Sequence, residues 1–209
     1  MTKYKYAGFW NFMAKNYAKS AVSDEGAYQT KLAKTQTYLT PQSNVLEFGC
    51  GTGTTALTHA PLVQRILATD FSTKMIGIAQ SKADAAGITN VTFQQATLDE
   101  VRESDASFDM VMAHSILHLL PDKDAAIART FDLLKPGGVF VSSTACIAES
   151  ANFLKYVAPV GRAIGLLPYL DVFTANALLS AIKSAGFEIE HEWRPTPKSA
   201  LFLVARKPV

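Results

Sequence analysis

The sequence VLEFGCGTGT, residues 45–54, joins a short apolar run to three closely spaced glycines. The apolar run predicts a buried strand that ends near Phe48, and Thr54 opens a stretch with a helical pattern. Glycines at such a junction let the backbone approach a bound ligand closely, because no Cβ stands in the way. These ten residues therefore predict a strand, a turn and a helix, with a small molecule bound at the turn.

The same alternation continues along the chain from residue 44. The expected strands are 44–48, 65–69, 91–95, 108–112 and 139–143, with two late strands near 187–193 and 200–206. The expected helices are 54–60, 72–86, 122–134 and 174–185. Strands that alternate with helices of this length are typical of right-handed βαβ units and a mostly parallel sheet. The predicted fold class is α/β.

Composition narrows the functional classes. The chain has 209 residues, 48% of them hydrophobic, and a net charge of +2, which favours one globular domain over residues 1–209 and argues against a disordered chain. No apolar run reaches the ~18 residues that a membrane span needs. The two cysteines are too few for a disulfide framework or a cysteine-rich zinc site. We therefore expect a soluble, cytoplasmic protein.

Two segments lie outside the alternation. Residues 1–40 are rich in aromatic residues and carry a net charge of +4, whereas the rest of the chain carries −2. Residues 145–173 hold an apolar stretch interrupted by proline and glycine. We expect a helical N-terminal arm or lid in the first and a helical insertion over the substrate site in the second. Completion of the hydrophobic core is the alternative for both, and the basic arm could instead contact lipid or a partner protein.

The glycine spacing and two acidic residues narrow the ligand. Thr54 stands where the dinucleotide fingerprint would place its third glycine, and no lysine follows the glycines as a P-loop requires. Glu47 would repel a pyrophosphate but attract an ammonium or sulfonium group. Asp70 ends the next predicted strand, about 20 residues further on, where an acid accepts hydrogen bonds from ribose hydroxyls. Capping of the following helix is the alternative role for Asp70.

Five blocks of sequence together carry a family resemblance. They read VLEFGCGTG (45–53), ATD ending at Asp70, FDMVMAHSILHLLPD (108–122), LLKPGGVFV (133–141) and LLSAIKSAGFEI (178–189). In this order the blocks resemble the class I S-adenosylmethionine-dependent methyltransferases. The resemblance implies a Rossmann-like sheet of seven strands in the order 3-2-1-4-5-7-6, mostly parallel with the last strand antiparallel, and helices on both faces.

The resemblance also implies a site for S-adenosylmethionine. Its residues would be Glu47 near the methionine ammonium, Gly49, Cys50 and Gly51 along the cofactor, Asp70 on the ribose and Phe71 beside the adenine. One block departs from the family pattern, because Ala96-Thr97-Leu98 replaces a frequent Gly-Asp-Ala. Thr97 can still hydrogen-bond adenine and Leu98 can offer apolar contact, but the negative charge is absent.

The end of the fourth strand should bring Ala113 and His114 to the mouth of the site. His114 is the candidate general base for an acceptor that arrives protonated, with lining of the pocket as its alternative role. Nucleic-acid methylases that act on exocyclic amines usually carry Asn/Asp-Pro-Pro-aromatic at this point, and Ala-His-Ser-Ile argues against that class. Trp10 and Tyr17 are candidates to close over the cofactor methyl, since aromatic faces attract cations.

The sequence thus predicts methyl transfer from S-adenosylmethionine to a small-molecule acceptor by in-line displacement, with S-adenosylhomocysteine as product. No metal site, nucleic-acid partner or membrane span is expected. Two rival hypotheses stay open: an NAD(P)-dependent oxidoreductase on a related glycine loop, and a non-catalytic module that retains the cofactor-binding fold.

Overall fold

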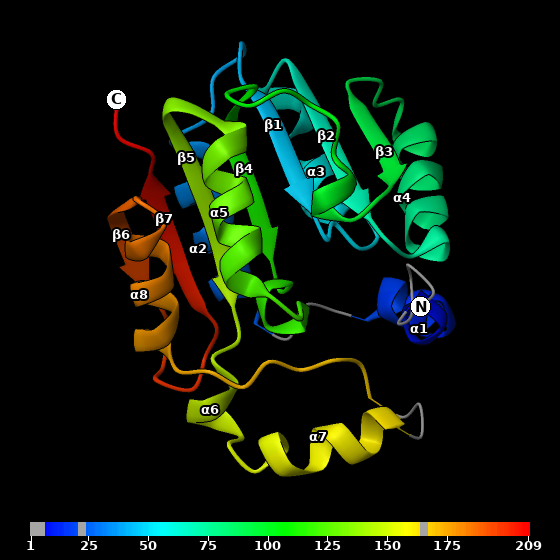
Figure 1. Ribbon diagram of the computed structural model, residues 1–209. Coiled ribbons are helices and arrows are strands. Elements are labelled where there is room, and N and C mark those ends of the chain that lie inside the picture. The colour runs from blue at the N-terminus through cyan, green and yellow to red at the C-terminus, as the bar shows by residue number, and fades with distance from the viewer. Residues whose placement is uncertain (1–6, 21–23, 164–166) are drawn as a thin grey trace. The chain divides into compact units, whose positions relative to one another are not determined.

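The computed structural model describes residues 7–20, 24–163 and 167–209 (Figure 1). The chain forms two compact units, residues 1–102 and 103–209, and each is described by itself. The first unit contains α1 (Ala7–Lys19), α2 (Glu25–Gln36), β1 (Asn44–Phe48), α3 (Thr54–His59), β2 (Arg65–Asp70), α4 (Thr73–Ala86) and β3 (Val91–Gln95). The second contains β4 (Phe108–His114), α5 (Lys123–Leu133), β5 (Leu134–Thr144), α6 (Ile147–Ser150), α7 (Leu154–Ala163), α8 (Ala175–Ser184), β6 (Glu188–Trp193) and β7 (Leu201–Arg206). Short 3-10 helices lie at Ala60–Leu62, Leu98–Glu100 and Leu117–Leu119.

The strands form a seven-stranded sheet in the order β3-β2-β1-β4-β5-β7-β6. β1 pairs in parallel with β2, β2 with β3, and β4 with β5. β7 runs antiparallel to both β5 and β6. The strand order and the antiparallel last strand that the family resemblance implied are confirmed.

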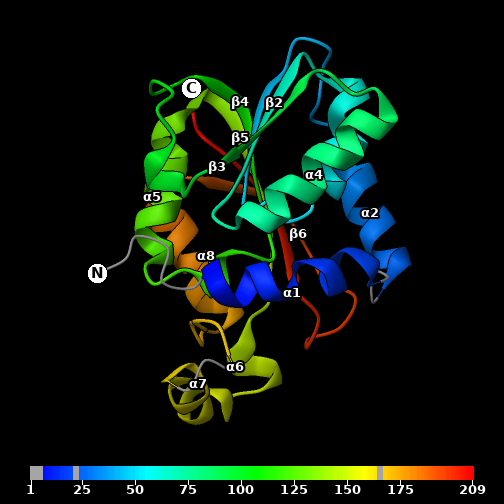
Figure 2. The same cartoon turned by 90° about the vertical axis from the view of Figure 1, so that its right-hand side faces the viewer.

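In the first unit, α4 begins and ends where the sequence indicates. The Ser72 hydroxyl accepts a hydrogen bond from the Met75 N–H at 3.2 Å, which caps the helix N-terminus. Gly87 ends the helix in the left-handed conformation, with φ of 65°. α4 packs against β2, β3 and α1, and Figure 2 shows α1 running beside the end of α4.

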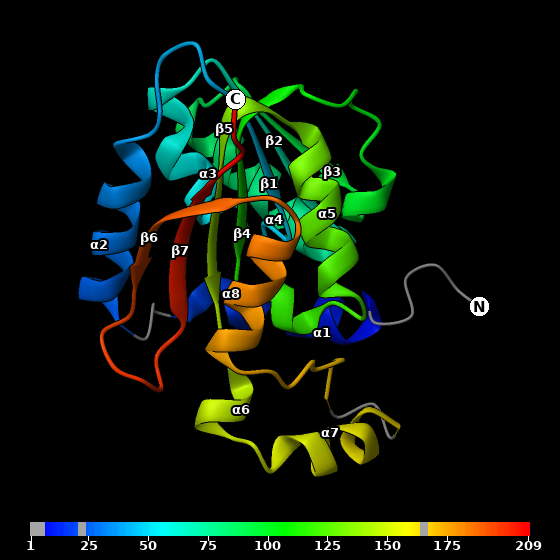
Figure 3. The same cartoon turned by 60° about the vertical axis from the view of Figure 1, so that its left-hand side comes forward.

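In the second unit, β5 begins earlier than the expected 139. It starts at Leu134, directly after α5, because Leu134 pairs with Phe108 and the register then shifts before Met110 pairs with Val139. Gly137 sits in this irregular stretch with φ of 75°, and its N–H donates to the Lys207 carbonyl at 2.9 Å. The Lys-Pro-Gly-Gly stretch is thus a bulged strand start rather than a loop. Helices α5 and α8 pack against each other beside this part of the sheet (Figure 3).

The two segments outside the alternation both contain helices. α1 and α2 make up most of the described part of the N-terminal arm, residues 1–40. Tyr4 and Tyr6 of this arm lie outside the described residues. The insertion contains α6 and α7. Phe153, just before α7, and Tyr156 and Val160, on α7, have exposed fractions of 63%, 72% and 64%. No helix among the described residues has the length and apolar content required to cross a bilayer.

Candidate active site

Glu47 is buried near the end of β1, with 2% of its surface exposed. Burial raises the pKa of its carboxyl to about 8; a hydrogen bond from the Ala56 backbone opposes this rise, and the nearby Asp70 adds to it. Its Oε2 atom is buried and accepts no hydrogen bond within the described part of the chain. A buried carboxylate oxygen without a donor is costly, so this position is suited to a ligand that brings a cation or an N–H group.

The loop after β1 uses its glycines for their backbone freedom. Gly49, Gly51 and Gly53 have φ of 67°, 54° and 75°, the left-handed region that other residues avoid. Gly53 also lacks room for a side chain, since a Cβ there would lie 2.7 Å from the Phe93 ring. The loop is held to β2 by the Cys50 N–H, which donates to the Thr69 carbonyl at 2.9 Å. Its backbone is therefore shaped for close approach to a ligand.

Asp70 ends β2 and links the two loops that follow β1 and β2. Its Oδ2 accepts from the Gly51 N–H at 3.0 Å and its Oδ1 accepts from the Ser72 N–H at 2.8 Å. Burial raises the pKa of Asp70, and these two hydrogen bonds lower it in part. A carboxylate oxygen can accept more than one hydrogen bond, so Asp70 keeps acceptor capacity for ligand hydroxyls.

Tyr17 brings α1 to this site. A Cβ built on Gly51 would lie 3.6 Å from Cε1 of the Tyr17 ring, which places the ring against the glycine loop. Burial raises the pKa of the Tyr17 hydroxyl, and the negative charges of Asp70 and Glu47 raise it further. Trp10 packs edge-on against Tyr17 with ring centroids 6.4 Å apart. The site therefore has an aromatic side supplied by the N-terminal arm.

The segment after β3 holds an interaction that the sequence reading missed. The Glu100 carboxylate accepts from both the Thr97 N–H, at 2.9 Å, and the Thr97 hydroxyl, at 3.0 Å. The signal was present, because Thr-x-x-Glu is the spacing of a capping box. Leu98 is buried, and the carbonyl of the half-buried Phe71 accepts from the Gln95 amide at 3.2 Å. Glu100 thus holds Thr97 in place at the start of the short 3-10 helix.

A second missed contact involves Lys82 on α4. Its ammonium donates to the hydroxyls of Thr52 and Thr54, at 3.1 Å each, and so braces the outer side of the glycine loop.

In the second unit, Ala113 is buried and His114 is half-buried at the end of β4. His114 pairs with Ser143 of β5, and the Ser115 N–H donates to the Ser143 carbonyl at 2.7 Å. Ser115 has φ of 55°, an unusual value for a residue with a side chain, so the chain turns sharply after His114. β4 is longer than the expected 108–112 and carries His114 as its last residue.

His118 follows in a 3-10 helix, where burial lowers its pKa to about 4 and keeps the imidazole neutral. Burial also raises the pKa of the Cys146 thiol to about 11, which removes it as a nucleophile.

Comparison with known proteins agrees with this geometry. Residues 45–138, which include the glycine loop, Asp70 and His114, match the model of the methyltransferase domain family. The chain contains a methyltransferase domain. A ubiquinone biosynthesis O-methyltransferase from Paracidovorax citrulli is 30% identical over 152 residues, which cover 69% of this chain and 63% of the relative.

Solved structures share the fold of this methyltransferase domain. An S-adenosylmethionine-dependent methyltransferase from Mesorhizobium loti aligns with a TM-score of 0.70 and 22% identity, over 87% of this chain and 99% of that one. The cyclase SpnF aligns with a TM-score of 0.74 and 21% identity, over 90% of this chain and 84% of that one. The chain spans 24% to 64% of the length of the curated relatives it matches.

The residues of the methyltransferase domain suit S-adenosylmethionine better than a dinucleotide. The unpartnered Oε2 of Glu47 fits a positively charged amine, and the negative charge of an ionised Glu47 would repel a pyrophosphate. Asp70 fits the ribose hydroxyls. The carboxylate of Glu47 therefore argues against the NAD(P) hypothesis.

Proposed function

We propose that this chain transfers a methyl group from S-adenosylmethionine to a small-molecule acceptor and forms S-adenosylhomocysteine. The observation that carries the proposal is the buried Glu47 carboxyl, whose Oε2 has no partner in the described structure and lies at the end of β1 before a ligand-shaped glycine loop. When bound, the cofactor supplies a methyl group on an activated sulfonium.

The first unit holds the residues that would bind the cofactor. Glu47 would accept the methionine ammonium, and Asp70 the ribose hydroxyls. The backbone along Gly49, Cys50 and Gly51 would lie against the cofactor, and Phe71, Thr97 and Leu98 would surround the adenine. Tyr17 and Trp10 would cover the site and exclude water, which strengthens the electrostatic contacts inside. Alignment of the reacting groups is worth roughly 7–11 kcal/mol in such a displacement.

The acceptor is proposed to be compact and partly apolar. The apolar side chains exposed on α7 support this, because an insertion with such a face is suited to cover a hydrophobic substrate. The names of the ubiquinone biosynthesis relatives point in the same direction. The proposed partner is therefore a small molecule rather than nucleic acid.

The direct test is transfer of label from methyl-labelled S-adenosylmethionine to a broad panel of small phenols, acids and amines. A first step is the thermal shift of the protein with S-adenosylhomocysteine or NADH, because a ligand that binds the native state raises its melting temperature. Stabilisation by NADH alone would contradict the proposal. Binding without transfer to any acceptor would favour the non-catalytic alternative.

His114 is proposed as the general base when the acceptor is an alcohol or phenol. His114→Ala should then reduce turnover by roughly 10²- to 10⁴-fold and change the pH dependence of kcat, because the base is lost. The check is the pH profile of kcat, with His191→Ala on β6 as the matched control. Retained turnover with an unchanged pH profile would remove His114 as the base.

A further inference from the structure

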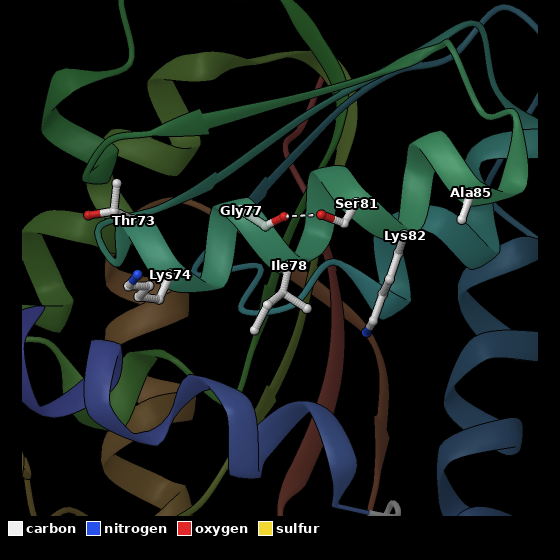
Figure 4. A pocket seen from close by; sticks show the side chains of 7 residues that line it. All are labelled: Thr73, Lys74, Gly77, Ile78, Ser81, Lys82 and Ala85. Carbon is white, nitrogen blue, oxygen red and sulfur yellow. Dashed lines mark hydrogen bonds between the residues drawn. The ribbon is translucent and has the colours of Figure 1, made fainter.

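Helix α1 packs against α4 with one face and leaves the other exposed. Ala14 is its one buried residue, and Phe12 is 80% exposed. A groove of about 760 Å³ runs along the neighbouring α4, and Figure 4 shows α1 passing beside the same helix. The groove is lined by Thr73, Lys74, Gly77, Ile78, Ser81, Lys82 and Ala85. α1 contacts α4 along this side, and a few of those contacts are polar and specific.

Asn11 makes the most specific of these contacts. Its Oδ1 accepts from the Ser72 hydroxyl at 2.7 Å and from the Lys74 N–H at 3.1 Å. Ser72 is completely buried, and its own N–H donates to Asp70 Oδ1 at 2.8 Å. A continuous hydrogen-bonded path therefore runs from α1 through Ser72 to the acid proposed to bind the ribose.

The same helix reaches the site a second time, six residues further on. Tyr17 lies against Gly51, whose N–H donates to the other oxygen of Asp70 at 3.0 Å. Asn11 and Tyr17 thus engage the two loops that Asp70 connects. Gly51 and Ser72 therefore contact α1 and also hydrogen-bond Asp70, so they link the position of α1 to the geometry of the proposed cofactor site.

We propose that Asn11 is a positioning residue that holds α1 over the cofactor site, and that α1 detaches to admit and release the cofactor. The inference rests on the proposed function, because it assigns the regulation of that same site. Ala14 is the one fully buried residue of α1, and Phe9, Trp10 and Met13 are only partly buried, so detachment of α1 uncovers a limited apolar face. A bound cofactor adds contacts to Tyr17 and so favours the closed state.

Binding of S-adenosylhomocysteine, measured by calorimetry, gives the first readout. Asn11→Ala removes the acceptor and should weaken binding by about three- to tenfold, the size expected for loss of a hydrogen bond. Asn11→Asp keeps an acceptor oxygen at the N-terminus of α4 and should restore binding. Phe12→Ala, the matched control on the exposed side of the same helix, should leave binding unchanged.

Cleavage by trypsin after Lys15 and Lys19 gives the second readout. Both lysines are exposed, yet a protease cuts a helix only when it opens locally. S-adenosylhomocysteine should slow this cleavage in the wild-type protein, and Asn11→Ala should speed it without ligand while the melting temperature changes little. Unchanged affinity in Asn11→Ala, or cleavage that the ligand does not slow, would overturn the inference.

The two proposals fail in different ways. A wild-type protein that does not bind S-adenosylhomocysteine contradicts the proposed function, and the inference falls with it. Tight binding by the wild type together with unaltered binding by Asn11→Ala contradicts the role of Asn11 alone.

Discussion

The ends of β1 and β2 each carry a buried carboxyl group, and the two groups are satisfied differently. Glu47 is 2% exposed and Asp70 is 7% exposed, on strands that pair side by side. Asp70 accepts a backbone N–H on each of its oxygens, whereas Glu47 leaves Oε2 without a partner in the described residues. At similar burial, Asp70 is therefore partly satisfied by the protein and keeps capacity for further hydrogen bonds, whereas Glu47 has one oxygen that no described residue satisfies and that a ligand can.

The difference gives Asp70 a structural task in addition to ligand recognition, and leaves recognition as the main task of Glu47. Asp70 ties Gly51 to Ser72, so it shapes the site before a ligand arrives. Glu47 destabilises the ligand-free protein when it ionises, because its charge is buried without compensation. Such a group gains most from a cation that enters the site. The predictions below test whether the two acids divide the work in this way.

The largest expected effect is on stability as a function of pH. The carboxyl of Glu47 has a pKa of about 8 in the folded protein and 4.5 as its ordinary value. The folded state therefore holds this proton more tightly, and the stability contributed by protonated Glu47 is lost as pH rises from about 4.5 to 8. Glu47→Gln should be more stable than the wild type by a few kcal/mol above pH 8 and by much less at pH 5.

Chemical denaturation of both proteins between pH 5 and 9 without ligand measures this difference. Glu188→Gln, on the exposed side of β6, is the control for loss of a carboxylate. A difference between wild type and Glu47→Gln that stays constant with pH would show that Glu47 is already ionised in the folded protein.

The second effect is on ligand affinity. Glu47→Gln should weaken binding, although it should stabilise the ligand-free protein. Glu47→Gln keeps the shape of the side chain but removes its charge, so it should weaken S-adenosylhomocysteine binding by about 10- to 150-fold, the value of a charge-assisted hydrogen bond. Calorimetry at pH 8 is the measurement, again with Glu188→Gln beside it. A variant that is more stable yet binds less well would separate recognition from folding, whereas unchanged affinity would leave Glu47 without its proposed role.

The third effect ranks Asp70 against Thr97. Asp70→Ala removes the proposed ribose acceptor and also frees two backbone N–H groups, so it should weaken cofactor binding by about tenfold or more. Thr97→Ala removes one hydroxyl, while Glu100 still accepts from the backbone of residue 97, so its effect should stay below about fivefold. Titration of both variants with S-adenosylhomocysteine decides the ranking, and equal losses would refute it.

The local structure that was predicted correctly around the candidate site depends on short spacings. The glycine loop and the cap at Ser72 lie in stretches where local chemistry determines the backbone. The hydrogen bond from the Thr97 hydroxyl to the Glu100 carboxylate is equally local, and the Thr-x-x-Glu spacing could have predicted it.

The features that the sequence could not predict depend on contacts between distant residues. β5 starts at Leu134 because that residue pairs with Phe108, and no local pattern reports such a pairing. Asn11 accepts a hydrogen bond from Ser72, which lies 61 positions further along the chain. The contact of Asn11 with the site can therefore be seen only in the folded chain. The arm was predicted to be helical from its composition, but composition does not indicate which of its side chains reaches the site.

The smallest expected effect is a proton released on binding, and it distinguishes the two acids most directly. At pH 7 Glu47 is largely protonated in the free protein, because its pKa of about 8 lies above that pH. A ligand ammonium favours the ionised form, so binding should release up to about one proton and affinity should rise as the pH is raised toward 8. Calorimetry of S-adenosylhomocysteine binding in two buffers of different ionisation enthalpy counts the released protons. Glu47→Gln should release none, and release that persists in this variant would assign the proton to Asp70 instead.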